Sequence, residues 1–459
     1  MSDKFSLSPT VVLRSEPNYY SSYAAFDYDR ATTEFLTQQE HRALEYISNG
    51  PADPADVSRE TGMKLNECKK FLKRMLSRKY VTHSIDTIET KARKKLDIGA
   101  EVYERFPLPF LSAPATVDLF ITSRCNLNCV HCFSSKDDGV MSELNTEKLQ
   151  SIFDQLEDLR VLEVRINGGE PLLHSRIGEV LMSLKKRRFR KVILTNGTLL
   201  DDSTIDILRD SRVIPTVSLD GCNAEEHDLF RRTQGSFART LKGLRLLQNR
   251  GIRYGINCCL HKRNLNKCAE ITELAVKYGA SRISFLDLRN VGRMRKHPHW
   301  IPAYREYRAA VPELVLSKIK YRKEIDVALD TFLHCHPLRE CAQEAERGYV
   351  SCHAGIRSLS IDSDGSIYPC NLVLSDKKWN MGNLGEEAME DVWFSDKWLF
   401  FRGGVRVSDL EICRDCHDLK RCKDFYCRLL SYVNNDDPFG PHPKCRRPHH
   451  GPLVETRSA

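Results

Sequence analysis

The sequence predicts an α/β protein: a partial (β/α)6 barrel in mid-chain, a winged-helix-like domain before it and a cysteine-rich domain after it. Three observations support this prediction. Six short apolar stretches alternate with amphipathic ones from residue 115 to about 290, and residues 1 to about 95 follow a mixed strand and helix pattern. Nine of the 17 cysteines lie between Cys335 and Cys445. Alternating strands and helices are typical of a parallel sheet with helical crossovers.

The composition is that of a globular protein. The chain of 459 residues is long enough for about two to four domains, and 29% of it is charged and 41% hydrophobic. The net charge of +8 is a mild bias toward acidic partners and does not by itself indicate nucleic acid. The sequence has no run of about 18 apolar residues and no signal peptide, so we expect a cytoplasmic protein without membrane association. In a reducing cytosol, clustered cysteines more often hold metal than form disulfides.

Residues 1 to about 95 are predicted to form the winged-helix-like domain. Thr37 and Glu40 make a capping box at the start of its first helix. The expected elements are a hairpin over 10–14 and 23–29, a helix after Thr37, a short helix over 53–62, a third helix with its apolar face on Leu65, Cys68, Leu72, Met75 and Leu76, and a strand over 80–85.

The barrel is predicted from six strand candidates with amphipathic helices between them. These are residues 117–122, 162–167, 191–196, 214–220, 254–260 and 281–287. In such folds the functional site lies at the carboxyl ends of the strands. We therefore expect the site where the segments that follow these strands meet.

Three cysteines follow the first of these strands, in the segment TSRCNLNCVHCFSS. Cys125, Cys129 and Cys132 are separated by three and then two residues, and no fourth cysteine follows nearby. Iron–sulfur cubanes usually take four thiolates, so three thiolates leave one iron open for a chelating substrate. A zinc site completed by His131 is the less favoured alternative, because zinc-binding pairs usually recur as two-residue spacings.

A CxxxCxxC loop after the first strand of an α/β barrel resembles the radical S-adenosylmethionine (SAM) superfamily. The resemblance implies that these cysteines hold a 4Fe–4S cluster whose open iron binds the amino and carboxylate groups of SAM. It also implies reductive cleavage of SAM to a 5′-deoxyadenosyl radical, which takes a hydrogen atom from the substrate.

Residues at later strand ends match positions that contact SAM in that superfamily. NGGEP (167–171) resembles the GGE motif, in which Glu170 contacts the SAM amino group and Gly168 and Gly169 permit close backbone approach. A GGEP segment by itself could also be a turn, and the polar residues could be ordinary strand-end residues. The other contacts that the resemblance implies are His131, Asn196, Ser218, Arg231 and Asn257.

The C-terminal cysteines resemble the SPASM domain, an extension of radical SAM enzymes that usually holds two auxiliary 4Fe–4S clusters. Twelve residues separate Cys352 from Gly365, and four more precede Cys370. Between Cys422 and Cys427 there are four residues where three are usual, so a one-residue insertion is implied.

The resemblance also implies the ligand sets. One auxiliary cluster is expected on Cys413, Cys416, Cys422 and Cys445, and the other on Cys352, Cys370 and Cys427. Cys341 is preferred to Cys335 as the fourth ligand of the second cluster. Alternatively, this cluster has an open site for a substrate thiolate. A further alternative is that the cysteines form two zinc knuckles in place of the clusters. We expect ordinary core residues at Cys68, Cys222, Cys258, Cys259 and Cys268.

A winged helix most often binds DNA, and the third helix carries basic residues that suit phosphates. These are Lys69, Lys70, Lys73, Arg74, Arg78 and Lys79. Joined to a radical SAM–SPASM protein, however, the domain resembles the RiPP recognition element. That domain binds the leader of a ribosomally made precursor peptide as an added strand beside the third helix.

The resemblance spans nearly the whole chain and implies a peptide-modifying radical SAM enzyme, similar to sactipeptide and ranthipeptide synthases. The preferred reaction is thioether formation between a cysteine sulfur and a carbon. Carbon–carbon crosslinking, decarboxylation, epimerisation and sulfatase-maturase-like oxidation are alternatives, and a DNA-binding iron–sulfur redox sensor is a remote one. The expected partners are a precursor peptide and an electron donor such as flavodoxin or ferredoxin; nucleic acid is not expected.

The predicted domains are the leader-binding domain (1–95), the radical SAM partial barrel (112–310), a helical connector (311–334) and the SPASM domain (335–450). No residue is singled out as a catalytic base.

Overall fold

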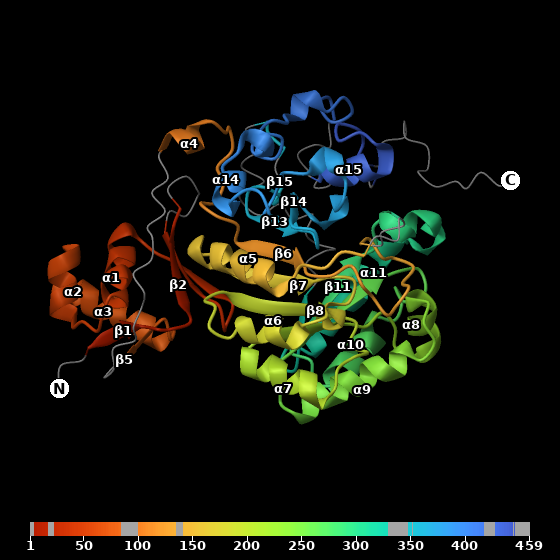
Figure 1. Ribbon diagram of the computed structural model, residues 1–459, viewed down its shortest axis with the longest axis horizontal. Helices are drawn as coiled ribbons and strands as arrows, with labels where there is room; N and C mark the ends of the chain where they lie inside the picture. Colours follow the sequence, from red (N-terminus) through yellow and green to blue (C-terminus); the bar gives the residue numbers. More distant parts are fainter. Residues whose placement is uncertain are drawn as a thin grey trace.

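The computed structural model describes residues 4–16, 23–83, 100–134, 141–328, 348–350, 352–416, 427–443 and 445. Their main feature is a ten-stranded sheet in the order β12-β11-β10-β9-β8-β7-β6-β13-β14-β15. From β12 to β13 neighbouring strands are parallel, and β13, β14 and β15 are antiparallel. Figure 1 shows the barrel helices along one side of this sheet and the C-terminal elements on the other.

The α/β barrel prediction is confirmed, and each of the six strand candidates coincides with an observed strand. The elements of this part are α4 (Ala100–Glu104), β6 (Thr116–Phe120), α5 (Thr146–Asp158), β7 (Glu163–Asn167), α6 (Ile177–Ser183), β8 (Arg190–Thr195), α7 (Asp202–Ser211), β9 (Ile214–Ser218), α8 (Ala224–Arg231), α9 (Ser236–Asn249), β10 (Gly255–Leu260), α10 (Cys268–Lys277), β11 (Arg282–Asp287), α11 (Tyr304–Lys320) and β12 (Asp326–Ala328).

The two faces of the barrel strands differ in polarity. Val217, Ile256 and Cys258 are fully buried in the main apolar core, which also contains the inner faces of the helices. Ser218 and Asn257 alternate with them and are half-buried on the opposite face. The interior face of the sheet can therefore carry the polar groups of a binding site.

The segment predicted as a helical connector differs from the prediction. Helix α11 already begins at Tyr304, and β12 extends the barrel sheet by pairing in parallel with β11. A three-residue strand is too short to show an alternating pattern, and Val327 fits equally well into a helical one. The strand is defined only by its partner, since Ile283 and Val327 are paired across the two strands.

The C-terminal part continues the barrel sheet on its other edge. Strand β13 pairs in parallel with β6, the strand that precedes the three cysteines. Gly365 closes the turn between β13 and β14 with a φ of +92°, in the left-handed region that favours glycine. The bounds are β13 (Ser358–Ile361), β14 (Ser366–Tyr368), β15 (Gly382–Asn383), α14 (Met389–Trp393) and α15 (Arg428–Asn435).

The N-terminal part has its own apolar core, built from one face of each of three helices and the adjoining strands. The capping box of Thr37 and Glu40 is present at the start of α1. The bounds are β1 (Phe5–Leu7), β2 (Val11–Ser15), β3 (Tyr23–Asp27), β4 (Thr32–Phe35), α1 (Gln38–Ser48), α2 (Pro54–Thr61), α3 (Leu65–Ser77) and β5 (Val81–His83). The sequence did not indicate β1, which pairs with β5, or β4, which pairs with β3.

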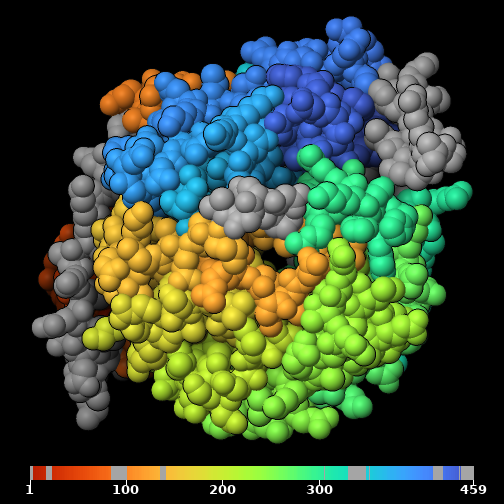
Figure 2. Space-filling view, turned by 45° about the vertical axis from the view of Figure 1, so that its right-hand side comes forward, coloured from red at the N-terminus to blue at the C-terminus, as the bar shows by residue number. Residues whose placement is uncertain are grey.

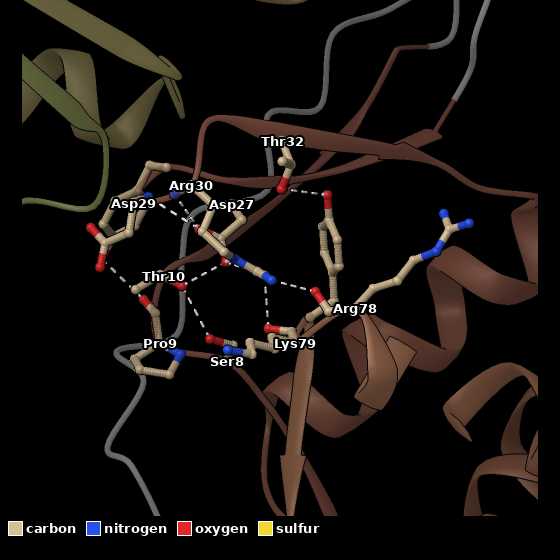
Figure 3. Close-up of polar contacts among 11 residues, drawn as sticks. Ser8, Pro9, Thr10, Asp27, Asp29, Arg30, Thr32, Arg78 and Lys79 are labelled. Carbon is tan, nitrogen blue, oxygen red and sulfur yellow. Dashed lines mark hydrogen bonds and ion pairs between the residues drawn. The ribbon is translucent and has the colours of Figure 1, made fainter. Parts of the chain in front are cut away.

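One arginine ties the hairpin of the N-terminal part to the end of α3 (Figure 3). Asp27 accepts hydrogen bonds from Thr10 (2.9 Å) and from Arg30 Nε (2.9 Å). The Arg30 guanidinium also donates to the carbonyl of Lys79 (3.0 Å). The position of the β2–β3–β4 sheet beside α3 is therefore set by directed contacts.

The N-terminal part packs against the end of the barrel at which β7 and β8 begin. The carbonyl of Leu13 accepts a hydrogen bond from Arg160 (3.1 Å). Arg14 donates to the carbonyl of Ala113 (2.7 Å) and forms a buried ion pair with Glu16. The three cysteines follow the carboxyl end of β6, so the N-terminal part and the cysteine loop lie at opposite ends of the parallel strands (Figure 1).

No helix among the described residues is long and apolar enough to cross a membrane.

Candidate functional site

The three cysteines lie in a loop that begins directly after β6 and is held by backbone hydrogen bonds from two later segments. The amide of Val130 donates to the carbonyl of Phe230 at the end of α8 (2.9 Å). The amide of Arg293 donates to the carbonyl of Cys132 (2.9 Å). We call residues 122–134 the cysteine loop. Helical propensity plays no part in its shape, which depends on tertiary contacts.

The three thiols influence one another. Burial raises the pKa of Cys125 and of Cys129. The thiolates of Cys129 and Cys132 raise that of Cys125 further, and the thiolate of Cys132 raises that of Cys129 further. Three thiolates so close repel each other unless a cation lies among them, which is the condition that an iron–sulfur cluster meets. The structure thus brings together the three cysteines that the sequence singled out.

Gly168 and Gly169 pack directly on the backbone of the cysteine loop. The amide of Gly169 donates to the carbonyl of Thr122 (2.8 Å), and a Cβ on Gly168 would lie 2.7 Å from that same oxygen. A Cβ on Gly169 would collide with the backbone of Arg124. Because these glycines have no side chain, the end of β7 can pack against the loop backbone. They therefore have a structural role in addition to any contact with a ligand.

Glu170 is 1% exposed, and protein donors bind both of its carboxylate oxygens. Thr195 donates to Oε1 (2.6 Å), and the amide of Asn196 donates to Oε2 (2.7 Å). Burial raises the pKa of Glu170 to about 7, although these hydrogen bonds favour the ionised form. The carboxylate joins the end of β7 to the end of β8 beside the cysteine loop.

Asn196 connects that carboxylate to the loop itself. Its side-chain amide donates to Asn126 in the cysteine loop (2.8 Å), and Thr198 donates its backbone amide to the Asn196 oxygen (2.9 Å). The sequence did not single out Asn126. Its place between Cys125 and Cys129 is the only signal that could have indicated it.

Arg231 and Asp220 form a buried ion pair beside Cys129. Arg231 Nη1 lies 3.6 Å from the Cys129 sulfur, within hydrogen-bond distance for a thiolate. Asp220 is completely buried, and it also accepts a hydrogen bond from the amide of Cys259 (2.8 Å). The Arg231 guanidinium holds the pKa of Asp220 below its usual value against the effect of burial. The sequence did not single out Asp220, although it lies two residues after Ser218.

His131 stacks on Phe230, with ring centroids 4.3 Å apart and the planes within 3°. Burial and the charge of Arg231 lower the pKa of His131 to about 3, so its ring is neutral. Neither Nδ1 of His131 nor Nε of Arg231 has a hydrogen-bond partner in the part of the chain that the structure describes. Buried polar atoms without partners, beside three thiols, fit a site that receives a polar ligand.

Ser218 and Asn257 lie side by side on the interior face of the sheet, because they are paired across β9 and β10. Both are half-buried. Figure 2 shows a hollow where orange residues of the segment after β6 meet green-to-teal residues beyond β11. The residues that the sequence proposed as SAM contacts therefore divide between the surroundings of the cysteine loop and the interior face.

Among the C-terminal cysteines, Cys352, Cys370 and Cys427 lie close together. Burial raises the pKa of Cys370, and the thiolates of Cys352 and Cys427 raise it further. Cys413 and Cys416 share one turn, in which the amide of Cys416 donates to the carbonyl of Cys413 (3.0 Å). The remaining predicted ligands Cys335, Cys341 and Cys422 lie outside the described residues, and Cys445 follows a turn at His442.

The five cysteines expected in the core divide into two groups. Cys68, Cys258 and Cys268 are completely buried in apolar clusters. Cys222 and Cys259 are only half-buried. Cys259 shares the interior face with Asn257, so it belongs to the lining of the barrel and not to the core as expected.

Comparisons with known proteins agree with this arrangement. Residues 119–275 match the Radical SAM superfamily, and residues 352–417 match an iron–sulfur cluster-binding domain called SPASM. The subtilosin biosynthesis protein AlbA of Bacillus subtilis is 29% identical over 292 residues, which are 63% of this chain and 60% of AlbA. An AdoMet-dependent heme synthase of Methanosarcina barkeri is 29% identical over 73% of this chain and 97% of its own. The mycofactocin maturase MftC of Mycolicibacterium smegmatis is 28% identical over 75% of this chain and 86% of its own.

A solved structure shares the fold over nearly the whole chain. SuiB of Streptococcus suis, crystallised with its precursor peptide SuiA, superimposes with a TM-score of 0.72 over 95% of this chain and 98% of SuiB, at 19% identity. The similarity therefore includes the N-terminal part as well as the barrel and the C-terminal part.

Proposed function

This chain is a radical SAM enzyme with a SPASM domain that uses SAM and 4Fe–4S clusters, and on that premise we propose that it modifies a ribosomally made precursor peptide. The observation that carries the proposal is the N-terminal part. A catalytic barrel for a small metabolite has no need of a separate unit with a strand edge and a basic helix at the far end of its strands. A long, flexible substrate can use both ends at once.

The N-terminal part has the features of a peptide-binding edge. Strand β4 pairs with β3 alone among the described strands, and Phe35 at its end is 66% exposed. An extended peptide can add to such an edge through backbone hydrogen bonds. Lys69, Lys70 and Lys73 are exposed on the neighbouring α3, where they would attract an acidic leader. We assign residues 1–95 to leader binding on this basis.

The names of similar proteins support a peptide substrate. AlbA is a bacteriocin biosynthesis protein, MftC is a maturase, and SuiB was crystallised with a precursor peptide. The heme synthase similarity favours a second candidate, a tetrapyrrole substrate. Incubating the reconstituted enzyme with each substrate class separates the two functions.

In the proposed site Cys125, Cys129 and Cys132 hold the SAM-binding cluster, and the bound cluster and SAM together supply the 5′-deoxyadenosyl radical. Arg231 places a positive charge beside the Cys129 sulfur, and Asp220 keeps the guanidinium in that orientation. Glu170 and Asn196 brace the loop from the ends of β7 and β8. Ser218 and Asn257 present polar groups on the interior face, where SAM and the peptide would meet.

The two auxiliary clusters are assigned to the C-terminal cysteines. Cys352, Cys370 and Cys427 lie together and would serve one of them, with Cys341 as the proposed fourth ligand. Cys413, Cys416, Cys422 and Cys445 would serve the other. Strand β13 continues the barrel sheet beside β6, so the segment that contains Cys352 and Cys370 is joined by backbone pairing to the strand before the cysteine loop. An external reduced electron carrier would supply the electron for each SAM cleavage.

The proposed reaction is thioether formation. One hydrogen atom would leave the acceptor carbon to the 5′-deoxyadenosyl radical, and the thiol would lose its proton. A carbon–sulfur bond would form with loss of one electron, which an auxiliary cluster held by the C-terminal cysteines would accept. The test is mass spectrometry of a cysteine-containing precursor after incubation with SAM and dithionite. Each thioether removes two hydrogens and protects one cysteine from alkylation, whereas decarboxylation loses carbon dioxide and epimerisation leaves the mass unchanged.

Removing residues 1–95 tests the role of the N-terminal part. We expect modification of the full-length precursor to be lost while SAM cleavage with dithionite continues, because the barrel keeps its own cluster. Full modification by the truncated enzyme would contradict the assignment of this part to leader binding.

A further inference from the structure

A basic surface lies next to the cysteine loop. It is formed by the residue after α8, the turn after β10 and the two 3-10 turns after β11, η2 (Gly292–Lys296) and η3 (Pro298–Trp300). Its exposed members are Arg232, Lys262, Arg263, Arg295, Lys296 and His299. We call these six residues the basic surface.

The positive charges of this region act on one another. Partial burial lowers the pKa of His297, and the nearby charges of Arg232, His299, Arg293 and Lys296 lower it further. Like charges held close together repel one another. An acidic partner would offset this repulsion when it binds.

The η2 segment, which carries Arg295 and Lys296 of the basic surface, contacts the backbone of the cysteine loop directly. Arg293 donates its amide to the carbonyl of Cys132 (2.9 Å) and its guanidinium to the carbonyl of Cys129 (2.7 Å). A Cβ on Gly292 would lie only 2.7 Å from the Phe133 Cα, so the two segments touch through their main chains. A partner docked on η2 would be separated from two of the three cysteines by little more than one layer of backbone.

A column of aromatic rings leads from the same surface to the loop. The ring centroid of the exposed His299 is 6.1 Å from that of Trp300, which is 5.3 Å from Phe230. Phe230 is in turn 4.3 Å from His131, the residue before Cys132. Arg263 lies over the Trp300 ring, at 5.3 Å from its centroid. Electron transfer through proteins weakens steeply with distance, and this column is densely packed from the surface to the cysteine loop.

From this geometry we propose that the basic surface is the docking site for an acidic protein that carries one reducing electron. In the step it serves, the carrier loses one electron and the oxidised cluster on the cysteine loop gains it, with no proton or bond exchanged. The proposal rests on the proposed function, which requires one external electron for each SAM cleavage.

A protein carrier fits this surface better than the substrate peptide does. The peptide must reach the interior face of the sheet, where Ser218 and Asn257 lie, whereas the six residues of the basic surface are exposed and the η2 segment contacts the backbone of the cysteine loop. The proposed leader site is at the opposite end of the strands. Electron carriers need only approach the cluster, and opposite charges accelerate such brief encounters.

The test compares two charge reversals in the full-length, anaerobically reconstituted enzyme. One variant carries Lys262→Glu and Lys296→Glu in the basic surface. The control carries Lys185→Glu and Lys186→Glu, two exposed lysines just before β8, at the opposite end of the barrel strands. Both variants change the net charge equally. The probe is reduced recombinant flavodoxin, an acidic one-electron carrier, and the readouts are its dissociation constant and the stopped-flow rate of cluster reduction at low salt.

We expect the basic-surface variant to lose about tenfold in both readouts and the control to change by less than about twofold. The difference should shrink as salt rises. SAM cleavage driven by dithionite should be equal in the two variants and wild type, because a small reductant needs no docking surface.

Equal effects of the two variants, or a wild-type enzyme that does not bind flavodoxin, would overturn the proposal. So would a basic-surface variant that accepts electrons normally but loses affinity for the precursor peptide, since the surface would then serve the substrate. If the wild-type enzyme cleaves no SAM with dithionite, the proposed function itself fails. The dissociation constant of flavodoxin does not depend on SAM cleavage, so the two failures can be distinguished.

Discussion

The two ends of the barrel both use arginine–carboxylate pairs, but they use them in opposite environments. At the cysteine loop, the side chains of Arg231 and Asp220 are 8% and 0% exposed. In the N-terminal part, Arg74 pairs with Glu40 (2.7 Å), and their side chains are 42% and 16% exposed. The first pair holds a charge beside a cysteine sulfur, while the second joins α1 to α3, a helix that also carries exposed lysines.

The difference in burial suits the two ion pairs to different roles: the buried pair positions a charge, and the more exposed pair lies on a surface that can recognise a peptide. A buried charge must keep its partner, because an unpaired ion in the interior costs several kcal/mol. Such a pair can hold a group in one orientation throughout catalysis. An exposed pair is worth about 0–1 kcal/mol and exchanges easily with water or a ligand. A surface meant to receive a peptide benefits from charges of the second kind.

The largest expected effect is at the cysteine loop. The reconstituted wild-type protein should bind about 12 irons as three four-iron clusters, and Cys125→Ala should lose about four of them and all SAM cleavage. Cys68→Ala is the matched control, since that thiol is buried in the N-terminal core and should keep the full iron content. Iron analysis and 5′-deoxyadenosine production measure both. Retained cleavage in Cys125→Ala would refute the assignment of the open cluster.

The next effect tests the buried ion pair. Asp220→Asn leaves Arg231 buried and unpaired, and we expect the apparent free energy of unfolding to fall by about 3–5 kcal/mol. Glu40→Gln in the partly exposed pair should cost less than about 1 kcal/mol, because glutamine can still accept the capping hydrogen bond from the amide of Thr37. Urea denaturation of both variants, followed by tryptophan fluorescence, gives the comparison. The double variant Asp220→Asn/Arg231→Gln should recover part of the lost free energy of unfolding. If Asp220→Asn and Glu40→Gln lower the free energy of unfolding by similar amounts, the two ion pairs do not differ as described.

The third prediction concerns recognition. Reversing Lys69, Lys70 and Lys73 to glutamate should weaken leader binding by roughly 1–3 kcal/mol if the contacts are partly desolvated. The effect should decline as salt rises. Fluorescence anisotropy with labelled leader, and in parallel with labelled duplex DNA, measures it. Tight, sequence-selective DNA binding without peptide affinity would favour the redox-sensor reading of this part.

The smallest expected effect lies where the N-terminal part meets the barrel. Lys191 on β8 is 4% exposed, lies 5.7 Å from the Tyr28 ring centroid, and burial lowers its pKa to about 8. Below that pH the folded protein holds a buried ammonium, whereas the unfolded chain binds the proton up to its ordinary pKa. The stability of the folded state should therefore rise with pH as it passes through about 8.

Lys191→Met removes this charge, so we expect it to stabilise the protein more at pH 7 than at pH 9, by a difference of about 1 kcal/mol. Denaturation at the two pH values measures it, and Lys185→Met, an exposed lysine just before the same strand, is the control. An equal effect of Lys191→Met at both pH values would show that Lys191 does not titrate in this range.

Local patterns were sufficient to predict the barrel strands and the cysteine loop. Each strand carries several consecutive apolar residues, and the spacing of Cys125, Cys129 and Cys132 needs no knowledge of distant residues. Strand β12 escaped prediction because three residues carry too little pattern, and only its pairing with β11 defines it. Cys259 looked like a core residue because its neighbour Cys258 is one, and adjacent positions of a strand face opposite sides.

By itself, then, the sequence determined the order of the parts, the parallel barrel and the spacing of the three cysteines in the first loop. These follow from periodicity and spacing, which are local properties. Only the tertiary structure decided that Asp220 holds Arg231 beside Cys129, that Arg293 braces the loop, and that the N-terminal part lies at the far end of the strands. The physical reason is that these ion pairs and hydrogen bonds join segments that are distant in the chain. Which distant segments come together depends on tertiary packing, and this packing produces no periodic pattern in the sequence.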